Sequence, residues 1–425
     1  MRLLLWTLVV LAFVVVPLYA WRLRGRQYAT FALVILAVAL PGAVVMHWRY
    51  LALVPPAWGV LLDAAFAYGT ATAALHLASL VTPRLRRQPF RWAISIPGMV
   101  FVGAGALGGV WLVILAPVRA VLVSIGATGV LDVLRWADVL PFAAAIVSVV
   151  TSSRPVDEIV RVLLGKDGPT EVRRVPVERY RRRAPAPLSA RPLRIVQIAD
   201  PHLGPWQPVR KLQALIERLV DLEPDLVLLT GDFLTMEGSA TPGALIEALR
   251  PLRRMPDRCF AIYGNHDHDR GARAEVYAGL EANGVQLLVD EDTVVETPVG
   301  PVQIVGADYV GRGRREHIRT VLERCPPRPD HVRILLLHDP LGFKHVPIGD
   351  VDLTLSGHTH GGQLGLVSFG FDWTVLSRTR WPDHGLFGHG SNRLYVHRGS
   401  GFYGFPLRIG VPGEASMLEL VRNEG

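Results

Sequence analysis

The stretch LRIVQIADPH, residues 193–202, is an apolar run that ends in an aspartate and a histidine, and four later runs have similar polar endings. These are Leu226–Thr230 before Gly231-Asp232, Cys259–Tyr263 before Gly264-Asn265-His266-Asp267, Val332–Leu337 before His338, and Asp352–Ser356 before GHTHGGQ at 357–363. Continuous apolar runs of this length are typical of buried parallel strands, and ligands gather beyond the carboxyl ends of strands in open α/β sheets. The sequence therefore predicts one site where five strand ends meet.

Helical patterns separate these predicted strands. Apolar residues recur at helical spacing between Leu212 and Val220, and residues 244–250, 272–282 and 314–323 are further helix candidates. Strands that alternate with helices imply an α/β sheet with right-handed crossovers. After Gly361 the chain becomes rich in Gly, Phe and Trp, and we expect short strands such as 393–397 and 415–420 to complete a second sheet that packs on the first.

The front of the chain has the composition of a membrane domain. The 425 residues are 50% hydrophobic, and the mean hydropathy is +0.29. Runs at 3–21, 28–46, 58–81 and 97–118 reach the roughly 20 residues that cross a bilayer, 139–150 is a shorter candidate, and 119–135 is ambiguous. A single run of this kind could also be a buried core helix or a signal peptide. So many in succession predict a multi-span helical membrane domain over residues 1–153.

Loop charge bears on orientation, because Lys and Arg accumulate on the cytoplasmic side of a membrane. Arginines cluster after the first run, at 22–26, and after the third, at 84–91, and these two loops share a side. The amino terminus is then outside. Five spans make the strand-rich part of the chain cytoplasmic, whereas four or six place it outside. Further arginines at 173–183 favour the cytoplasmic alternative.

Residues 154–191 have the composition of a basic, proline-rich juxtamembrane linker. Prolines stand at 155, 169, 176, 185 and 187, and much of the net charge of +8 lies here and in the short loops. Such a segment favours anionic lipid head groups over nucleic acid, although a plain solvated linker fits equally well.

The residues at the predicted strand ends have the chemistry of a two-metal hydrolytic site. Such a site needs oxygen ligands, neutral imidazoles and one carboxylate that can bridge both ions. Asp232, behind a glycine that permits a tight turn, suits the bridge, and Asn265 offers an oxygen without a further charge. A lone His338 would more often be a structural histidine. The candidate ligands are Asp200, His202, Asp232, Asn265, His338, His358 and His360.

Taken in order, these motifs resemble the calcineurin-like metallophosphoesterase superfamily over residues 192–425. The GHTHGGQ segment is similar to the membrane-linked bacterial subgroup typified by YkuE. The resemblance implies a metal-dependent phosphoric ester hydrolase whose fold is a four-layer αββα sandwich, preceded here by the membrane domain. It also implies two divalent metal ions, with Mn, Fe and Zn all compatible with these ligands.

The resemblance assigns a role to each motif residue. One metal takes Asp200, His202, Asp232 and His360, and the second takes Asp232, Asn265, His338 and His358. His266 is the catalytic histidine, and Asp267 is grouped with it and orients the loop. The expected nucleophile is a hydroxide that bridges the metals. Six other histidines (268, 331, 345, 384, 389 and 397) fall outside the motifs, and for Arg398 a salt bridge is favoured over a phosphate contact.

The substrate is left open between a phosphorylated small molecule and a lipid-linked phosphoester or pyrophosphate, with the bilayer as a partner. A nuclease would need a basic groove with interleaved aromatic residues around the site, so no nucleic acid is expected. A membrane sensor or transport protein whose phosphoesterase domain binds a phosphate ligand without turnover is the alternative. The acidic residues Asp63, Asp132 and Asp138 are few for a transport pathway.

Overall fold

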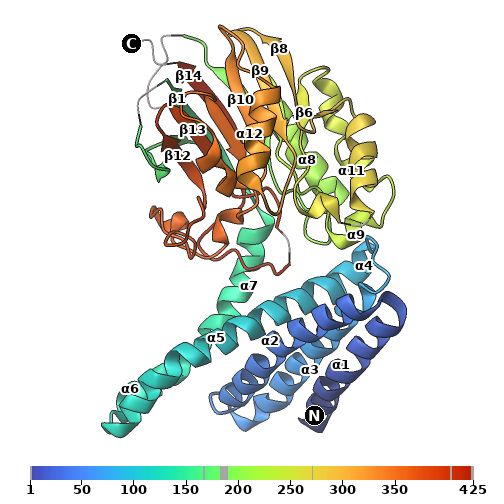
Figure 1. The fold of residues 1–425 in the computed structure, drawn as a ribbon. Helices are drawn as coiled ribbons and strands as arrows, with labels where there is room; N and C mark the ends of the chain where they lie inside the picture. The colour runs from blue at the N-terminus through green and yellow to red at the C-terminus, as the bar shows by residue number, and fades with distance from the viewer. Residues whose placement is uncertain (1, 166–167, 182–189, 270, 403, 423–425) are drawn as a thin grey trace. The chain divides into compact units, whose positions relative to one another are not determined.

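The computed structural model describes residues 2–165, 168–181, 190–269, 271–402 and 404–422, which form two compact units (Figure 1). The first unit comprises Met1–Val150 and Tyr403–Ile409, and the second comprises Thr151–Phe402 and Gly410–Gly425. The first unit is helical, and the second contains the sheets.

The first unit confirms the expected apolar helices. In the described residues, five helical segments are long and apolar enough to cross a membrane: Leu3–Arg24, Arg26–Leu51, Pro56–Ser79, Gln88–Ser124 and Thr128–Ser153. The ambiguous stretch 119–135 is divided between the end of the fourth segment and the start of the fifth. The elements are α1 (Arg2–Arg24), α2 (Arg26–Leu51), α3 (Pro56–Ser79), α4 (Gln88–Phe90), a π-helical turn (Arg91–Ser95), α5 (Ile96–Ser124), α6 (Thr128–Ala137) and α7 (Leu140–Ser153).

Small residues and a few polar contacts hold these helices together. Helices α2 and α5 pack so closely that a Cβ on Gly42 would collide with the backbone of Gly105, as is common for helices that associate in membranes. The Arg24 side chain donates to the carbonyl of Leu80. The loops that follow α1 and α3 therefore lie at the same end of the helices, which agrees with the inference from loop charge that they share a side.

The second unit contains two seven-stranded sheets within the described residues. Their strand orders are β3-β1-β14-β4-β5-β6-β7 and β2-β12-β13-β11-β10-β9-β8. Neighbours from β4 to β7 pair in parallel, and so do β9, β10, β11 and β13. The first sheet comprises β1 (Val156–Leu164), β3 (Glu178–Tyr180), β4 (Leu193–Ile198), β5 (Leu226–Leu229), β6 (Cys259–Ala261), β7 (Gln286–Leu287) and β14 (Glu414–Arg422). The second comprises β2 (Arg173–Arg174), β8 (Glu291–Thr297), β9 (Gly300–Ala307), β10 (Val332–Leu337), β11 (Leu353–Ser356), β12 (Gly385–His389) and β13 (Asn392–Val396).

The two sheets pack face to face and carry helices on their outer faces, which confirms the four-layer αββα sandwich. Buried side chains of both sheets, such as Ile195 and Ile334, share one core. On the far side of the second sheet, Ile318 and Leu322 of α12 pack beside Leu335, and Figure 1 shows α12 lying over β9 and β10. The helices are α8 (Val209–Val220), α9 (Met236–Ser239), α10 (Ala244–Ala248), α11 (Ala272–Glu281) and α12 (Arg314–Arg324), with 3-10 turns at Arg250–Arg254, His266–His268, Pro340–His345, His360–Gly362 and Val367–Phe369.

The expected linker at 154–191 is corrected by the structure, because it contributes strands to both sheets. Strand β1 pairs in parallel with β14 over nine residue pairs, β3 pairs with β1, and β2 pairs with β12. Val160, Val162 and Leu164 alternate into the core, a strand period that the surrounding charges and prolines obscure. Residues 182–189 of this segment, with Arg182, Arg183, Pro185 and Pro187, lie outside the described residues.

Basic residues of this segment serve the second unit itself. Arg161 lies 2.8 Å from Glu178, and Arg174 pairs with the buried Asp383. Arg398 is buried and pairs with Glu158 of β1 and with Glu414 of β14. The salt bridge expected for Arg398 is therefore confirmed, and these charges are less available for lipid head groups than the composition indicated.

The chain's last strand also departs from expectation. Residues 393–397 belong to the second sheet as predicted, but 415–420 lie in β14, between β1 and β4 of the first sheet. One of the two pairing partners of β14 is β1, a strand at the start of the unit, and that long-range pairing left no local signal.

Two neighbouring acidic residues, Glu158 and Asp157, provide a matched test of the packing of β1. Glu158→Gln removes a carboxylate from the buried Arg398 cluster and should cost about 3 kcal/mol of stability, because it leaves a buried charge with one partner fewer. Asp157→Asn removes only an exposed pair with Arg218 and should cost less than about 1 kcal/mol. Thermal unfolding of the full chain in detergent measures both. Equal melting of the two variants would contradict the packing of β1.

Candidate active site

The structure gathers the predicted ligand residues at the carboxyl ends of five strands. Asp200 and His202 follow β4, Asp232 follows β5, and Asn265 follows β6 in the first sheet. The remaining residues come from the second sheet, where His338 follows β10 and His358 and His360 follow β11. Because β4, β5 and β6 are neighbours, as are β10 and β11, the two sheets present these side chains to one place.

The side chains form two adjacent groups. The ligand atoms of Asp200, His202 and His360 lie within 4.8 Å of one another, and so do those of Asp232, His338 and His358. Asn265 belongs with the second group, since its Oδ1 lies 3.1 Å from His338 Nε2 and 2.7 Å from His358 Nδ1. In the first group, His202 Nε2 lies 3.2 Å from His360 Nε2.

A single carboxylate oxygen lies between the two groups. Asp232 Oδ2 is 3.7 Å from His202 Nε2 and 3.4 Å from His338 Nε2. The other oxygen, Oδ1, accepts a hydrogen bond of 2.8 Å from the backbone N–H of His266. Oδ2 is thus placed to face two cations at once.

One imidazole of the site is oriented by a backbone carbonyl, and two others are held in the neutral form. His338 Nδ1 lies 2.7 Å from the carbonyl of Thr230; a carbonyl only accepts, so Nδ1 carries the proton and Nε2 faces the site. Burial lowers the pKa of His202 to about 3 and that of His358 to about 4, which keeps both in the neutral form that binds metals. Burial also lowers the pKa of His338, but the Asp232 carboxylate raises it to a net value of about 10, so this position favours positive charge.

The backbone at the site is held in an uncommon conformation. Left-handed φ angles are rare for residues other than glycine, and they cluster where the surrounding structure enforces them for function. Five of the candidate ligands adopt them: Asp200 (φ 49°), His202 (φ 44°), Asp232 (φ 60°), His358 (φ 69°) and His360 (φ 51°).

Asp267, which the resemblance groups with the predicted catalytic residue His266, makes the contacts of a positioning residue. Its buried carboxylate accepts backbone hydrogen bonds from Asp232 (2.7 Å), Phe233 (2.9 Å) and Gly264 (2.8 Å). Burial, with the Asp232 carboxylate as a second cause, raises the pKa of Asp267. Its oxygens hold the loops after β5 and β6 together.

His266 stands at the more open side of the site. Its side chain is 28% exposed, its Nδ1 lies 3.4 Å from Asp269 Oδ2, and its ring centroid is 5.5 Å from that of His202. A partly exposed imidazole beside the ligand groups can reach a bound substrate.

Two aromatic residues beside the site escaped the sequence reasoning. The ring of Tyr309 lies 6.1 Å from that of His338 and 6.2 Å from that of His358, and the ring of Trp381 lies 5.3 Å from that of His358. Tyr309 had a usable signal, because the apolar run at 302–307 ends in Asp308-Tyr309 as a sixth strand end. Trp381 lies in an irregular segment that carried none.

The donor set fits two divalent ions. Buried carboxylates, an amide oxygen and oriented imidazoles are the ligands of borderline transition metals, and their convergence without ions would leave like groups facing one another. When bound, such ions supply Lewis-acid charge and lower the pKa of water.

Comparison with known proteins agrees with this geometry. Residues 193–362 match the family model described as calcineurin-like phosphoesterase. The chain is 31% identical over 240 residues to Phosphodiesterase YaeI of Escherichia coli, covering 55% of this chain and 84% of that protein. It is 31% identical over 229 residues to the uncharacterized metallophosphoesterase YkuE of Bacillus subtilis, covering 53% and 78%. Over 314 residues it is 30% identical to the bovine transmembrane protein with metallophosphoesterase domain, covering 69% and 65%.

The chain therefore belongs to the calcineurin-like phosphoesterase family, and it is a metal-dependent phosphoesterase of the membrane-linked, YkuE-like kind. Its five apolar helices and its likeness to proteins named as transmembrane indicate a membrane protein.

The metal content of the purified chain tests the two ligand groups. Wild-type protein should carry about two transition-metal ions per chain, and His338→Ala or His360→Ala should each lower this to about one or less, because each removes a ligand from one group. Elemental analysis by mass spectrometry measures the content. His345→Ala, which changes a histidine outside both groups, is the matched control. Full metal content in both site variants would refute the assignment.

Proposed function

We propose that this chain is a membrane-anchored phosphodiesterase that hydrolyses a phosphoester or pyrophosphate bond with two divalent ions, on a substrate in or next to the bilayer. The observation that carries the proposal is Asp232 Oδ2, which lies within 3.7 Å of an imidazole nitrogen of each ligand group. A carboxylate between two cation sites is what a two-metal hydrolase requires to hold both ions on one phosphoryl group.

In this proposal, Asp200, His202, Asp232 and His360 hold one ion, and Asp232, Asn265, His338 and His358 hold the other. The two ions, when bound, supply positive charge for the phosphoryl oxygens and make water a better nucleophile near neutral pH. The chain's own contribution is to fix the ligands before substrate arrives, through the strained backbone after β4, β5 and β11.

His266 is proposed as the group that protonates the leaving oxygen. Its backbone N–H is bonded to Asp232 Oδ1, so the imidazole is carried on the same loop that fixes the proposed bridging carboxylate. Asp269 Oδ2 lies 3.4 Å from His266 Nδ1 on one side of the ring, and the exposed face of the ring is open to substrate. Asp267 acts on the reaction through these loops as a positioning residue.

A diester is the favoured substrate class, since the E. coli relative is named a phosphodiesterase. A lipid-linked substrate is favoured by the five apolar helices, which keep the catalytic unit within reach of a bilayer. We further propose that the catalytic unit is cytoplasmic. Five spans combined with arginine-rich loops after α1 and α3, which lie at one end of the helices, give that orientation.

Hydrolysis of two aryl esters tests the proposal. The full chain in detergent with Mn²⁺ should cleave bis-p-nitrophenyl phosphate faster than p-nitrophenyl phosphate, and Asp232→Asn should abolish both reactions. His266→Gln should lower kcat by about 10²–10⁴ while metal content stays at the wild-type level, because it removes an acid and not a ligand. A fragment that begins after Ala190 would lack β1, β2 and β3 and is not a suitable substitute.

The matched control is His331→Gln, an exchange of the same residue types at a histidine outside the site, which should retain wild-type kcat. If folded, metal-loaded wild-type protein cleaves neither ester, either with or without added lipid, the proposal of a diesterase that accepts general esters is refuted. A hydrolase for a narrow lipid substrate, or a membrane protein that binds a phosphate ligand without turnover, then takes its place.

A further inference from the structure

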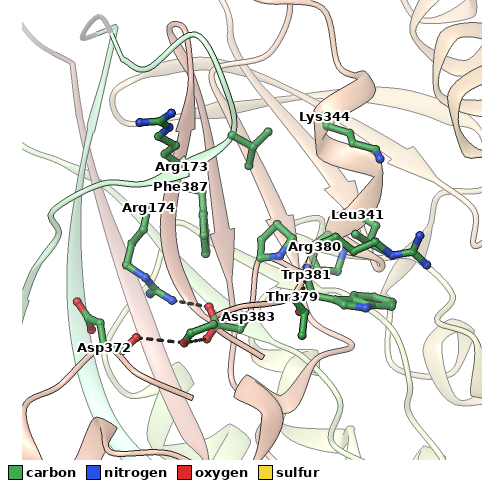
Figure 2. A pocket seen from close by; sticks show the side chains of 14 residues that line it. Arg173, Arg174, Leu341, Lys344, Asp372, Thr379, Arg380, Trp381, Asp383 and Phe387 are labelled. Carbon is green, nitrogen blue, oxygen red and sulfur yellow. Dashed lines mark hydrogen bonds and ion pairs between the residues drawn. The ribbon is translucent and has the colours of Figure 1, made fainter. Parts of the chain in front are cut away.

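A cavity of about 310 Å³ opens in the second unit (Figure 2). It is formed by three segments far apart in the sequence, at 172–174, 340–344 and 372–387. Its walls combine basic side chains with apolar ones, including Leu341, Trp381 and Phe387. No motif residue lines it, so the proposed chemistry leaves this cavity without a role.

Two contacts connect the cavity to the metal site. The ring of Trp381, in the cavity wall, lies 5.3 Å from the ring of the proposed ligand His358, tilted by 34°. The hydroxyl of Thr359, which stands between His358 and His360, donates a hydrogen bond of 2.5 Å to the carbonyl of Asp383 in the cavity floor. The cavity wall thus begins at a ring that contacts a proposed metal ligand, and the cavity floor is bonded to the segment that carries two of them.

The charge available in the cavity is positive. Four basic side chains line it against two acidic ones. Of the acidic pair, Asp383 is already engaged, since its carboxylate pairs with Arg174 and accepts hydrogen bonds from Thr374 (2.5 Å) and Ser377 (3.1 Å). Although burial raises the pKa of Asp383, the His384 ring, 3.2 Å from its carboxylate, together with Thr374 and Arg174, holds that pKa well below its ordinary value. The negative charge of Asp383 in the cavity floor is thus already balanced by its neighbours.

Lys344 and Arg380 are the cations that remain. Both are exposed, and among the described residues neither forms an ion pair with a carboxylate. Figure 2 shows them on the same side of the cavity as Trp381, with the Arg174 and Asp383 pair on the other side. Arg173, the fourth basic residue of the cavity, forms an ion pair of 3.1 Å with the exposed Glu171.

We infer that this cavity binds a second anionic group of the substrate, a phosphate remote from the ester that is cleaved, with Lys344 and Arg380 as its partners and Trp381 against the connecting group. The inference rests on the proposed function for the position of the first phosphate. Two cationic side chains that donate hydrogen bonds suit a phosphate, because charge-assisted hydrogen bonds are stronger than neutral ones. An aromatic wall suits a sugar or ring between the two phosphates. The substrate class is accordingly a phosphodiester or pyrophosphate with a further phosphate, either soluble or on a lipid.

A pair of ligands that differ by one phosphate tests the cavity by binding alone. Isothermal titration of the full, metal-loaded chain in detergent compares thymidine 3′,5′-bisphosphate with thymidine 5′-monophosphate. Wild-type protein should bind the bisphosphate about tenfold more tightly, as expected for one added charge-assisted contact at a half-open site. In Lys344→Gln with Arg380→Gln, the ratio of the two affinities should fall to about one to two.

The matched control is Arg378→Gln, because Arg378 is exposed on the same segment but does not line the cavity. It should keep the wild-type ratio, which separates a local contact from a general effect of charge. Equal affinities in wild-type protein, or a full preference in the double variant, would overturn the inference. If the wild-type chain prefers the bisphosphate but hydrolyses no ester, the proposed function is overturned, whereas the anion site in the cavity is supported.

A second arm identifies the source of the remote phosphate. The full chain is placed in nanodiscs that contain either phosphatidylinositol or phosphatidylinositol 4-phosphate, and the affinity for the soluble bisphosphate is measured again. If phosphatidylinositol 4-phosphate weakens binding of the soluble bisphosphate, and Arg380→Gln removes this competition, the result supports the cavity and assigns a lipid headgroup to it. An affinity that is the same in both nanodiscs, with the wild-type preference intact, supports the cavity and assigns a soluble substrate.

Discussion

The Asp267 carboxylate is the constraint on which the site depends. It binds the backbone N–H groups of Asp232, Phe233 and Gly264, and so ties the loop after β5 to the loop after β6. Asp232 in turn accepts from the backbone of His266. A left-handed residue such as Asp232 persists only when its surroundings over-determine it, and these bonds provide that determination. The Asp232 carboxylate, which lies between the two ligand groups, is therefore held in place by the Asp267 carboxylate, which faces no substrate.

Close packing of the loops adds to this constraint. A Cβ on Gly264 would collide with the Asp232 carboxylate, and one on Gly357 would collide with that of Asp200. The glycines before Asn265 and His358 are thus required by the space that the neighbouring carboxylates occupy. Strand β14 pairs with both β1 and β4, so that residues directly after the apolar helices complete the sheet that carries three of the five strand ends.

Much of the fold could be read from local pattern. The strand ends at Asp200, Asp232 and His338 were marked by apolar runs that stop at a candidate ligand, and the apolar helices were marked by length and composition. Strand β1 was missed because its period of two is crossed by Glu158 and Arg161, whose partners lie on β3, β14 and the loop after β13. A charged residue that is buried in a pair has the same sequence signature as one in a solvated linker.

The sequence by itself determined the α/β class, the apolar helices and the set of residues able to bind metal, because hydrophobic period and ligand chemistry are properties of short segments. Only the tertiary structure decided that Asp232 Oδ2 lies between the two groups, that Asp267 positions loops, and that Trp381 and Arg380 border a cavity next to His358. Those facts depend on contacts between segments far apart in the chain. Such contacts are set by the packing of two sheets against each other, which no single segment encodes.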